Sequence, residues 1–332
     1  MKKGATMDSS HYKRLTVSRG FTYNYYVSPA SDGKPTLLFL HGFPSTAQDW
    51  RRQVAHFKPK GYGLIVPDML GYGDTDKPLE ASDYVGSRLA QDVLDIVENE
   101  GVERVVVVAH DWGAVPASRL ANLYQDRFEG FAFLAAGYIS PGKEIDPEPV
   151  REMTKQLVGY ETGGYWWFLA SPEAPGIIKD HIDSFYDIIW AKDALPAWKT
   201  YFCPTGALKR SLKSDVRIER GDYITEEEYR QSQEVFLKNG YEAPCLYYKA
   251  MISCLNLEDA RAIPEEKHVI HKPVLFLGAA RDAVCLPAFY EPPKDLCPKA
   301  TSKTLDAGHW ILLEHEKEVN TELEAWLGSM GL

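Results

Sequence analysis

The sequence predicts an α/β protein built on a mostly parallel β-sheet, and three observations carry this prediction. Extended segments alternate with helical segments between residues 35 and 137, and again after residue 272. Most of these extended segments are apolar along their whole length, which is typical of parallel strands covered on both faces. The middle of the chain lacks the alternation and is rich in aromatic, Pro and Gly residues. We therefore expect a helical insertion within a sheet domain.

Eight extended segments account for the predicted sheet. The first two are rich in Thr, Tyr and Val and are separated by Gly20, so they are expected to form a hairpin. The other six follow at intervals that leave room for helices. In chain order, the eight segments are residues 13–20, 21–29, 35–42, 61–68, 102–110, 128–137, 272–280 and 302–310.

Helical periodicity appears between these segments. Residues 84–101 repeat apolar side chains at helical spacing and end at a glycine. Residues 114–128 are expected to form a second helix, because the early Pro116 falls in the first turn, where proline is tolerated. Residues 314–330 are expected to close the fold as a helix.

The change of pattern predicts how the chain is divided. Residues 1–139 and 264–332 are expected to form the sheet domain. Residues 140–263, which include a helical segment at 225–240, are expected to form a helical lid spliced between two strands. The sequence shows no repeats and no low-complexity segments.

Composition and charge exclude several classes of function. The formal net charge of −10 over 332 residues disfavours nucleic acid and anionic membranes as partners. The five cysteines form no CxxC pair, so no disulfide framework, metal site or cofactor is expected. No apolar run approaches the ~20 residues of a membrane span, and the first residues lack the apolar core of a signal peptide. These features predict a cytoplasmic protein and leave a homo-oligomer open.

A carboxylate stands where the most apolar strand breaks. Asp111 follows the strand VVVVAH and is flanked by Ala109, Gly113 and Ala114. Small neighbours allow a strand to turn abruptly into a helix, and such a turn lifts its central side chain above the strand ends. Asp is also a favoured helix N-cap, but a cap requires neither the small neighbours nor the buried strand. The pattern therefore favours Asp111 as a nucleophile.

Three motifs together resemble the α/β-hydrolase fold family. They are HGFP at 41–44, PDMLGYGDTDKP at 67–78 and HDWG at 110–113, and the resemblance covers nearly the whole chain. In many members the residue at this strand-to-helix turn, the nucleophile elbow, is Ser. In epoxide hydrolases and haloalkane dehalogenases it is Asp. The resemblance implies an eight-stranded, mostly parallel sheet with helices on both faces and a cap insertion. A carboxylate nucleophile forms an alkyl ester by displacement, and water then hydrolyses that ester.

Hydrolysis of the ester requires a base, and histidine suits neutral pH. His309 follows the last predicted strand, Gly308 allows the loop to aim its ring, and the family's base sits at this position. His110 and His41 are expected to be structural, because one precedes the elbow and the other belongs to the HGFP loop. The remaining histidines are expected on the surface: His11, His56, His181, His268, His271 and His315.

The base needs an acid that holds its tautomer and stabilises its charged form. Asp282 follows directly after a buried strand and is the preferred candidate. Asp306 competes because it lies three residues before His309, although an ordinary turn residue is the simpler interpretation. The order Asp111, Asp282, His309 matches the family's order of nucleophile, acid and base.

An oxyanion forms on the carboxyl group of Asp111 itself when water attacks the ester. The backbone N–H groups of Phe43 and Trp112 are placed by position to stabilise it, and each such donor is worth roughly 3–4 kcal/mol. Their contribution comes from the main chain and not from their side chains.

The leaving group separates the two families that use an Asp nucleophile. A halide needs only weak donors, whereas an opened epoxide is an alkoxide that requires a proton, which a phenol with a pKa of ~10 can provide. The resemblance implies Tyr165 and Tyr248 as these phenols. Where the family usually has Gln after the first tyrosine, the chain has Trp166-Trp167-Phe168, so Tyr160 stays open for that role, and Tyr247 stays open beside Tyr248.

Aromatic residues crowd the predicted lid and imply an apolar substrate pocket. The residues expected to bind substrate are Trp112, Trp166, Trp167 and Phe168.

The resemblance implies an epoxide hydrolase that converts a small apolar epoxide and water into a vicinal diol. Phe43 stands where haloalkane dehalogenases commonly place Asn, and Trp112 stands where fluoroacetate dehalogenases place Arg. Two alternatives stay open. The first is a haloalkane dehalogenase in which the indoles of Trp166 and Trp167 bind halide. The second is a non-catalytic relative, although such proteins usually lose members of the catalytic set.

Overall fold

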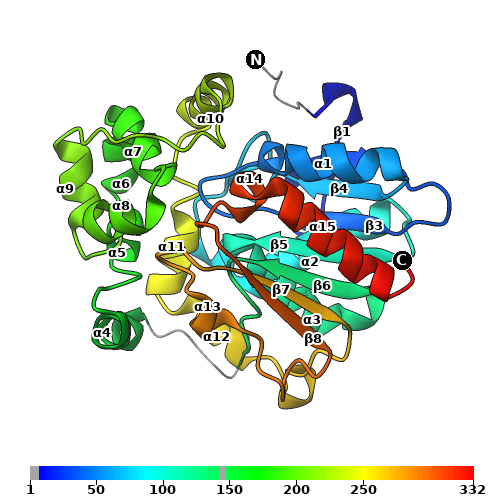
Figure 1. Cartoon of the computed structure of the whole chain (residues 1–332). Coiled ribbons are helices and arrows are strands. Elements are labelled where there is room, and N and C mark those ends of the chain that lie inside the picture. Colours follow the sequence, from blue (N-terminus) through cyan, green and yellow to red (C-terminus); the bar gives the residue numbers. More distant parts are fainter. Residues whose placement is uncertain (1–6, 142–146) are drawn as a thin grey trace.

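The computed structural model describes residues 7–141 and 147–332 and is organised around an eight-stranded sheet (Figure 1). The strand order is β1-β2-β4-β3-β5-β6-β7-β8. β1 and β2 pair antiparallel, β2 meets β4 antiparallel, and all other neighbours are parallel. The strands are β1 Tyr12–Thr16, β2 Thr22–Ser28, β3 Thr36–Leu40, β4 Gly63–Pro67, β5 Val105–His110, β6 Gly130–Leu134, β7 Val274–Ala279 and β8 Ala300–Leu305. The predicted eight-stranded, mostly parallel sheet is confirmed.

The central strands are apolar because both faces of the sheet are covered. Every residue of β3, β4, β5, β6 and β7 is buried. Figure 1 shows α1 and α15 in front of the sheet and α2 and α3 behind it. These covering helices are α1 Arg51–Phe57, α2 Gly86–Asn99, α3 Ala114–Tyr124 and α15 Glu316–Ser329, with the short α13 Pro287–Tyr290 and α14 Ile311–Glu314.

A run of helices separates β6 from β7. In Figure 1 most of it forms a cluster beside the sheet, and α12 lies at the far end of the run, next to the sheet domain. Its helices are α4 Pro147–Val158, α5 Trp166–Leu169, α6 Ala174–Asp180, α7 Ile182–Ile189, α8 Ala194–Tyr201, α9 Ala207–Lys213, α10 Glu226–Asn239, α11 Leu246–Ile252 and α12 Leu255–Arg261. α12 packs against α2 of the sheet domain. The lid boundaries at residues 140 and 263 therefore stay a prediction.

An ion pair and an indole hydrogen bond connect this helical segment to the sheet domain. Arg51 Nε in α1 donates to Glu228 Oε1 in α10 at 2.6 Å, and both groups are nearly buried. The indole N–H of Trp310 donates to the carbonyl of Ile189 in α7 at 3.0 Å. The carboxylate of Asp111 lies where the two parts meet, with Tyr165 and Tyr248 of the helical segment packed near it. Within the described residues, no helix combines the length and the apolar character that crossing a membrane requires.

Candidate active site

The carboxylate of Asp111 stands at a sharp turn between β5 and α3. Its φ of 50° lies in the left-handed region, which non-glycine residues adopt uncommonly and at a cost in strain. A Cβ atom added to Gly42 would overlap the Asp111 carboxylate, and one added to Gly113 would overlap the Leu40 carbonyl. Glycine at both positions therefore lets the turn at Asp111 close. The sequence predicted this for Gly113, a small neighbour of Asp111, but not for Gly42.

Two backbone N–H groups bind the Asp111 carboxylate. Phe43 N donates to Asp111 Oδ2 at 2.8 Å, and the N–H of Trp112 also hydrogen-bonds to the carboxylate. Phe43 comes from the loop after β3, which lies next to β5 in the sheet. The two donors that the sequence predicted for an oxyanion thus converge on one carboxylate from neighbouring strand ends.

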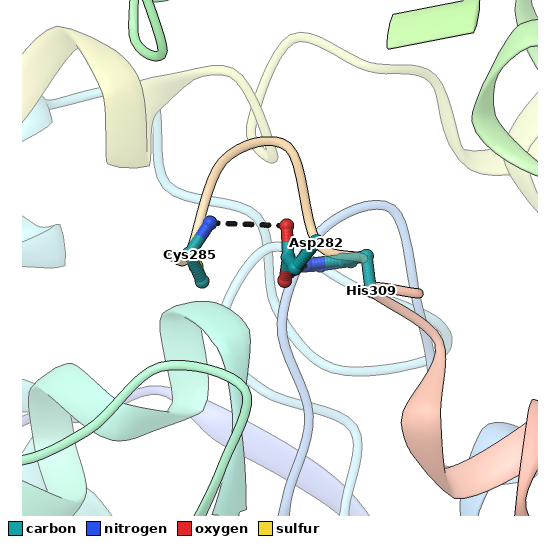
Figure 2. Close-up of side chains that lie close together, drawn as sticks. All are labelled: Asp282, Cys285 and His309. Atoms are coloured by element: carbon teal, nitrogen blue, oxygen red, sulfur yellow. Dashed lines mark hydrogen bonds and ion pairs between the residues drawn. The ribbon is translucent and has the colours of Figure 1, made fainter. Parts of the chain in front are cut away.

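His309 and Asp282 meet, as Figure 2 shows, and the pair lies beside the Asp111 carboxylate. His309 Nδ1 lies 2.8 Å from Asp282 Oδ2, and His309 Nε2 lies 3.8 Å from Asp111 Oδ1. The imidazole is buried, and Asp282 is fully enclosed. The ring nitrogen that faces Asp282 is therefore held by it, and the opposite nitrogen points at the Asp111 carboxylate.

The backbone around Asp282 fixes its orientation. Its Oδ1 accepts hydrogen bonds from Val284 N at 2.8 Å and from Cys285 N at 3.0 Å, and Figure 2 shows the second of these bonds. The competing Asp306 lies at the surface, where its carboxylate pairs with Arg281 at 3.1 Å. Of the two carboxylates, the structure brings only Asp282 to His309 within ion-pair distance among the described residues.

The three groups carry shifted pKa values. Burial lowers the pKa of His309, but the carboxylates of Asp282 and Asp111 outweigh it and raise the value to about 9. Burial also raises the pKa of Asp111, against the opposing effects of His309 and the Phe43 N–H. For Asp282, burial is outweighed by His309 and by backbone donors, so its pKa is lowered. Perturbations of this kind cluster at functional sites.

Two other buried histidines support the site from outside it. His110 Nε2 lies 2.8 Å from the carbonyl oxygen of His309 and so braces the loop that carries it. His41 Nε2 accepts from Met69 N at 3.0 Å and joins the HGFP loop to the segment after β4. The remaining six histidines are partly or fully exposed, as the sequence predicted.

The two predicted tyrosines lie together over the elbow. Tyr165 immediately precedes α5, Tyr248 lies in α11, and their ring centroids are 5.8 Å apart. Tyr248 packs edge-on against Phe43 at 5.0 Å and Trp112 at 5.1 Å, the residues whose N–H groups bind Asp111. Both tyrosines are buried. Burial, followed in Tyr165 by the Asp111 charge and in Tyr248 by the charges of Tyr165 and Asp111, raises both pKa values.

The alternative tyrosines use their hydroxyls elsewhere. Tyr160 donates to the carbonyl of Ala283 at 2.8 Å, next to Asp282. Tyr247 donates to the carbonyl of Leu70 at 3.0 Å and is buried. Both hydroxyls therefore brace loops, which favours Tyr165 and Tyr248 as the donors.

The residues predicted to bind substrate differ in their surroundings. Trp112, Trp166 and Phe168 are buried, and the ring of Trp166 lies 6.2 Å from that of Tyr165. Trp167 is only half-buried; it stacks on Trp166 and lies under the Arg151 guanidinium at 4.8 Å.

Comparison with known proteins identifies the family. A family model described as the alpha/beta hydrolase fold matches residues 35–316. The chain belongs to the α/β-hydrolase fold family. An epoxide hydrolase of Caballeronia sordidicola is 26% identical over 310 residues, covering 88% of this chain and 87% of the relative. Bifunctional epoxide hydrolase 2 of Rattus norvegicus is 25% identical over 303 residues, and the match spans 88% of this chain and only 51% of that protein.

Solved structures agree on the architecture. A crystal structure of epoxide hydrolase A from Mycobacterium thermoresistibile has a TM-score of 0.78 at 24% identity and covers 95% of this chain and 97% of its own. At this identity, the likeness establishes the α/β-hydrolase fold alone.

This α/β-hydrolase site contains neighbours to which the sequence assigned no role of their own. The ring of Trp198 in α8 lies 5.3 Å from that of His309, and Phe202 lies 4.2 Å from Tyr165. No motif marks either residue, because helix packing alone brings α8 to the site. The abundance of aromatic residues in the lid was the only available signal.

One group of donor atoms near the site raises the question of a metal. Single atoms of Asp282, Cys285 and His309 lie within 4.8 Å of one another (Figure 2). A metal would require a thiolate, but burial raises the pKa of the Cys285 thiol well above its ordinary value. The imidazole and the carboxylate are already bonded to each other. The arrangement therefore fits an acid–base pair better than a metal centre.

Proposed function

We propose that this protein hydrolyses epoxides to vicinal diols through a covalent ester on Asp111. One observation carries the proposal: Oδ2 of the Asp111 carboxylate is held by the Phe43 N–H, while Oδ1 faces the His309 imidazole at 3.8 Å. A displaceable carbon can therefore meet Oδ1, with the Phe43 N–H already on the other oxygen. Relatives named epoxide hydrolases, at 25–26% identity, support the choice of substrate.

In the first step, Asp111 Oδ1 attacks a ring carbon and the carbon–oxygen bond of the epoxide breaks. The released oxygen is an alkoxide, which takes a proton from Tyr165 or Tyr248. Burial raises the pKa of both phenols, so both are protonated in the free protein. An alkoxide is more basic than a phenolate, so the transfer remains favourable.

In the second step, esterification changes the electrostatics of the site. The ester removes the negative charge of Asp111, which is one of the carboxylate charges that raise the pKa of His309. The pKa of His309 then falls, so the imidazolium releases its proton to solvent, and the neutral imidazole can take a proton from the attacking water. Asp282 holds the ring and stabilises the imidazolium that forms.

The hydroxide produced in this way adds to Cγ of Asp111. Negative charge develops on Oδ2, where the N–H groups of Phe43 and Trp112 stabilise it. The bond from Cγ to Oδ1 breaks, the diol leaves with Oδ1, and His309 protonates it. The carboxylic acid left on Asp111 returns its proton to the tyrosinate. His309 takes up a proton from solvent as the Asp111 charge returns, which restores the starting state.

Diol formation from a panel of terminal, aryl and aliphatic epoxides tests the proposal, with Asp111→Asn as the control. We expect diol from at least one class of epoxide with the wild type and none with the variant. A single turnover in H₂¹⁸O should place the label in Asp111 and not in the diol. Bromide release from 1-bromoalkanes in parallel distinguishes the dehalogenase alternative. Bromide release that matches or exceeds diol formation would refute the proposal.

A further inference from the structure

Two tryptophan side chains enclose the base, one from each part of the molecule. Trp310 follows His309 directly and meets its ring edge-on, with ring centroids 5.4 Å apart. Trp198 lies in α8 of the helical segment, and its ring is tilted by 46° against the imidazole at a centroid distance of 5.3 Å. Both indoles are buried. The helical segment therefore contacts the base itself, in addition to placing two tyrosines near Asp111.

The end of α7 holds both tryptophans. The indole N–H of Trp198 donates to the carbonyl of Ile188 at 2.7 Å, and the indole N–H of Trp310 donates to the carbonyl of Ile189 at 3.0 Å. These are the last two residues of α7, where carbonyls have no donor within the helix. Because the two carbonyls are adjacent in the chain, they join α8 to the loop that carries His309. The position of Trp198 beside the imidazole is thus fixed by hydrogen bonds on both sides.

The same part of the helical segment connects the base to one of the two phenols. Phe202, which directly follows α8, has its ring centroid 4.9 Å from that of Trp198 and 4.2 Å from that of Tyr165. Tyr165, Phe202, Trp198 and His309 therefore form a continuous row of rings. A displacement of α8 would change the surroundings of the base and of a proton donor together.

The strongest charges on His309 come from the sheet domain. Asp282 and Asp111 face its two ring nitrogens, and Glu314 adds to their effect. The ring of His110 is close, at a centroid distance of 4.9 Å, but burial lowers the pKa of His110 to about 3 and keeps it neutral. These carboxylates stabilise the imidazolium in the free protein, and the ester on Asp111 removes one of them.

The helical segment presents an uncharged ring to the base. Lys199 is the one charged residue within α8, and its ammonium lies over the ring of Tyr160 at 4.7 Å. The thiol of Cys285, on the sheet-domain side, stays protonated because burial raises its pKa. An indole face attracts a cation within about 6 Å, and the attraction is stronger where water is excluded. The ring of Trp198 therefore favours the imidazolium over the neutral imidazole.

We propose that Trp198 is a positioning residue for the base, which holds the His309 ring toward Asp111 and stabilises its charged form while the ester is hydrolysed. The inference rests on the proposed epoxide hydrolysis and adds a residue of the helical segment to the pair of His309 and Asp282. The neutral imidazole gains a proton from water in this step, so its attraction to the indole strengthens toward the transition state. The helical segment then serves both steps, the first through its phenols and the second through Trp198.

The pH dependence of ester decay in single turnovers tests this role. Trp198→Leu removes the aromatic face and Trp198→Phe keeps a weaker one, while both lose the hydrogen bond to Ile188. In Trp198→Leu, the apparent pKa of ester hydrolysis should fall by about half a unit to one unit, and the plateau rate at high pH by about three- to tenfold. At low pH the rate should stay near wild type, because the ground state there is also an imidazolium and loses the same stabilisation.

The comparison of variants decides whether the ring is responsible. Trp198→Phe should retain most of the wild-type pKa and plateau rate. Trp326→Leu in α15 is the matched control, because it removes a buried indole from the sheet domain and should leave the pH profile unchanged. A rate loss in Trp198→Leu that is uniform across the pH range, or that Trp198→Phe shares in full, would overturn the proposal.

Fluorinated tryptophan gives the same test without a change of side-chain size, should Trp198→Leu fail to fold. Fluorine withdraws electron density from the indole face and so weakens its attraction for a cation. Incorporation of 5-fluorotryptophan at the eight tryptophans of the chain should lower the pKa of His309. The fall should be larger in wild type than in Trp198→Phe, where the other tryptophans are still replaced. Equal falls in the two proteins would overturn the proposal.

Histidine NMR of the free protein separates this inference from the proposed function. The signal of His309 is the one lost in His309→Gln, and its pKa, about 9 in wild type, should be lower in Trp198→Leu than in Trp198→Phe. If the pKa values follow this order but no epoxide is hydrolysed, the proposed function fails and the action of Trp198 on His309 stands. If epoxides are hydrolysed but the pKa in Trp198→Leu equals or exceeds that in Trp198→Phe, the inference fails and the function stands.

Discussion

The sheet domain and the helical segment hold their parts of the site in different ways. Asp111 and Asp282 follow β5 and β7, and backbone N–H groups bind both carboxylates. Tyr165 and Tyr248 come from the helical segment and are positioned by ring packing, at 4.2 Å to Phe202 for the first and 5.0 Å to Phe43 for the second. Backbone bonds fix a reacting group more tightly than ring packing does. We therefore expect substitutions of the reacting groups in the sheet domain to cause larger losses of activity than substitutions of the tyrosines in the helical segment.

The largest effects should come from the sheet domain. In His309→Gln, the ester on Asp111 should form but not hydrolyse, so turnover should fall by on the order of 10³-fold or more. Mass spectrometry after incubation with an epoxide should show a protein heavier by the mass of that epoxide. Full turnover by a folded His309→Gln variant would contradict the assignment.

The next largest effect tests which carboxylate serves the base. Asp282→Asn should slow ester hydrolysis by roughly 10²- to 10⁴-fold, because His309 loses both its orientation and its counter-charge. Asp306→Asn is the matched control and should stay near wild type, since Asp306 pairs with Arg281 at the surface. Single-turnover rates of ester decay measure both. A larger loss in Asp306→Asn would reverse the assignment.

Substitutions in the helical segment should cause smaller losses of activity when made singly and a larger loss when made together. Tyr165→Phe and Tyr248→Phe should each reduce the rate of ring opening by roughly 10- to 100-fold, because the other phenol remains. The double variant should lose far more. Pre-steady-state ester formation isolates this step. If both single variants keep wild-type rates of ester formation, the helical segment does not supply the proton.

A smaller effect should appear in stability. The pKa of His309, about 9, lies above its ordinary 6.5, so its stabilisation is complete below about pH 6.5 and is lost as the pH rises to 9. The full contribution is roughly 3 kcal/mol at 1.4 kcal/mol per unit. The free energies of unfolding of wild type and His309→Gln, measured with denaturant, should converge as the pH rises across this range. A difference in unfolding free energy that is independent of pH would show that Asp282 and Asp111 do not raise the pKa.

The smallest effect should come from a tyrosine that only braces a loop. Tyr160→Phe removes the hydrogen bond to the Ala283 carbonyl and should cost about 1 kcal/mol of stability with little change in ring opening. Ester formation and thermal unfolding measured on the same sample separate the two effects. A loss in ester formation as large as that of Tyr165→Phe would return Tyr160 to the role of proton donor.

The sequence was most informative where the chemistry sits at strand ends. Asp111 could be identified because an apolar strand, small neighbours and a following helix are all local features. The backbone N–H groups of Phe43 and Trp112 could also be placed by position, since parallel strands bring their carboxyl ends to one edge of the sheet. The eight-stranded sheet was predictable for the same reason: its strands are marked by their own residues.

The sequence alone was less informative for choices between near neighbours. Asp306 is closer to His309 along the chain than Asp282 is, yet it lies at the surface beside Arg281. Tyr160 and Tyr165 are both plausible phenols by composition. The partner of each hydroxyl, such as the Ala283 carbonyl that accepts from Tyr160, depends on how a helix packs onto a distant loop.

The sequence by itself therefore determined the α/β sheet, the carboxylate at the elbow and the candidates for the base and the acid. Each of these depends on local periodicity or on a position at a strand end. Only the tertiary structure brought His309 to Asp282 and Asp111 and placed Tyr165 beside Tyr248. Those outcomes depend on contacts between segments far apart in the chain, which no local pattern encodes.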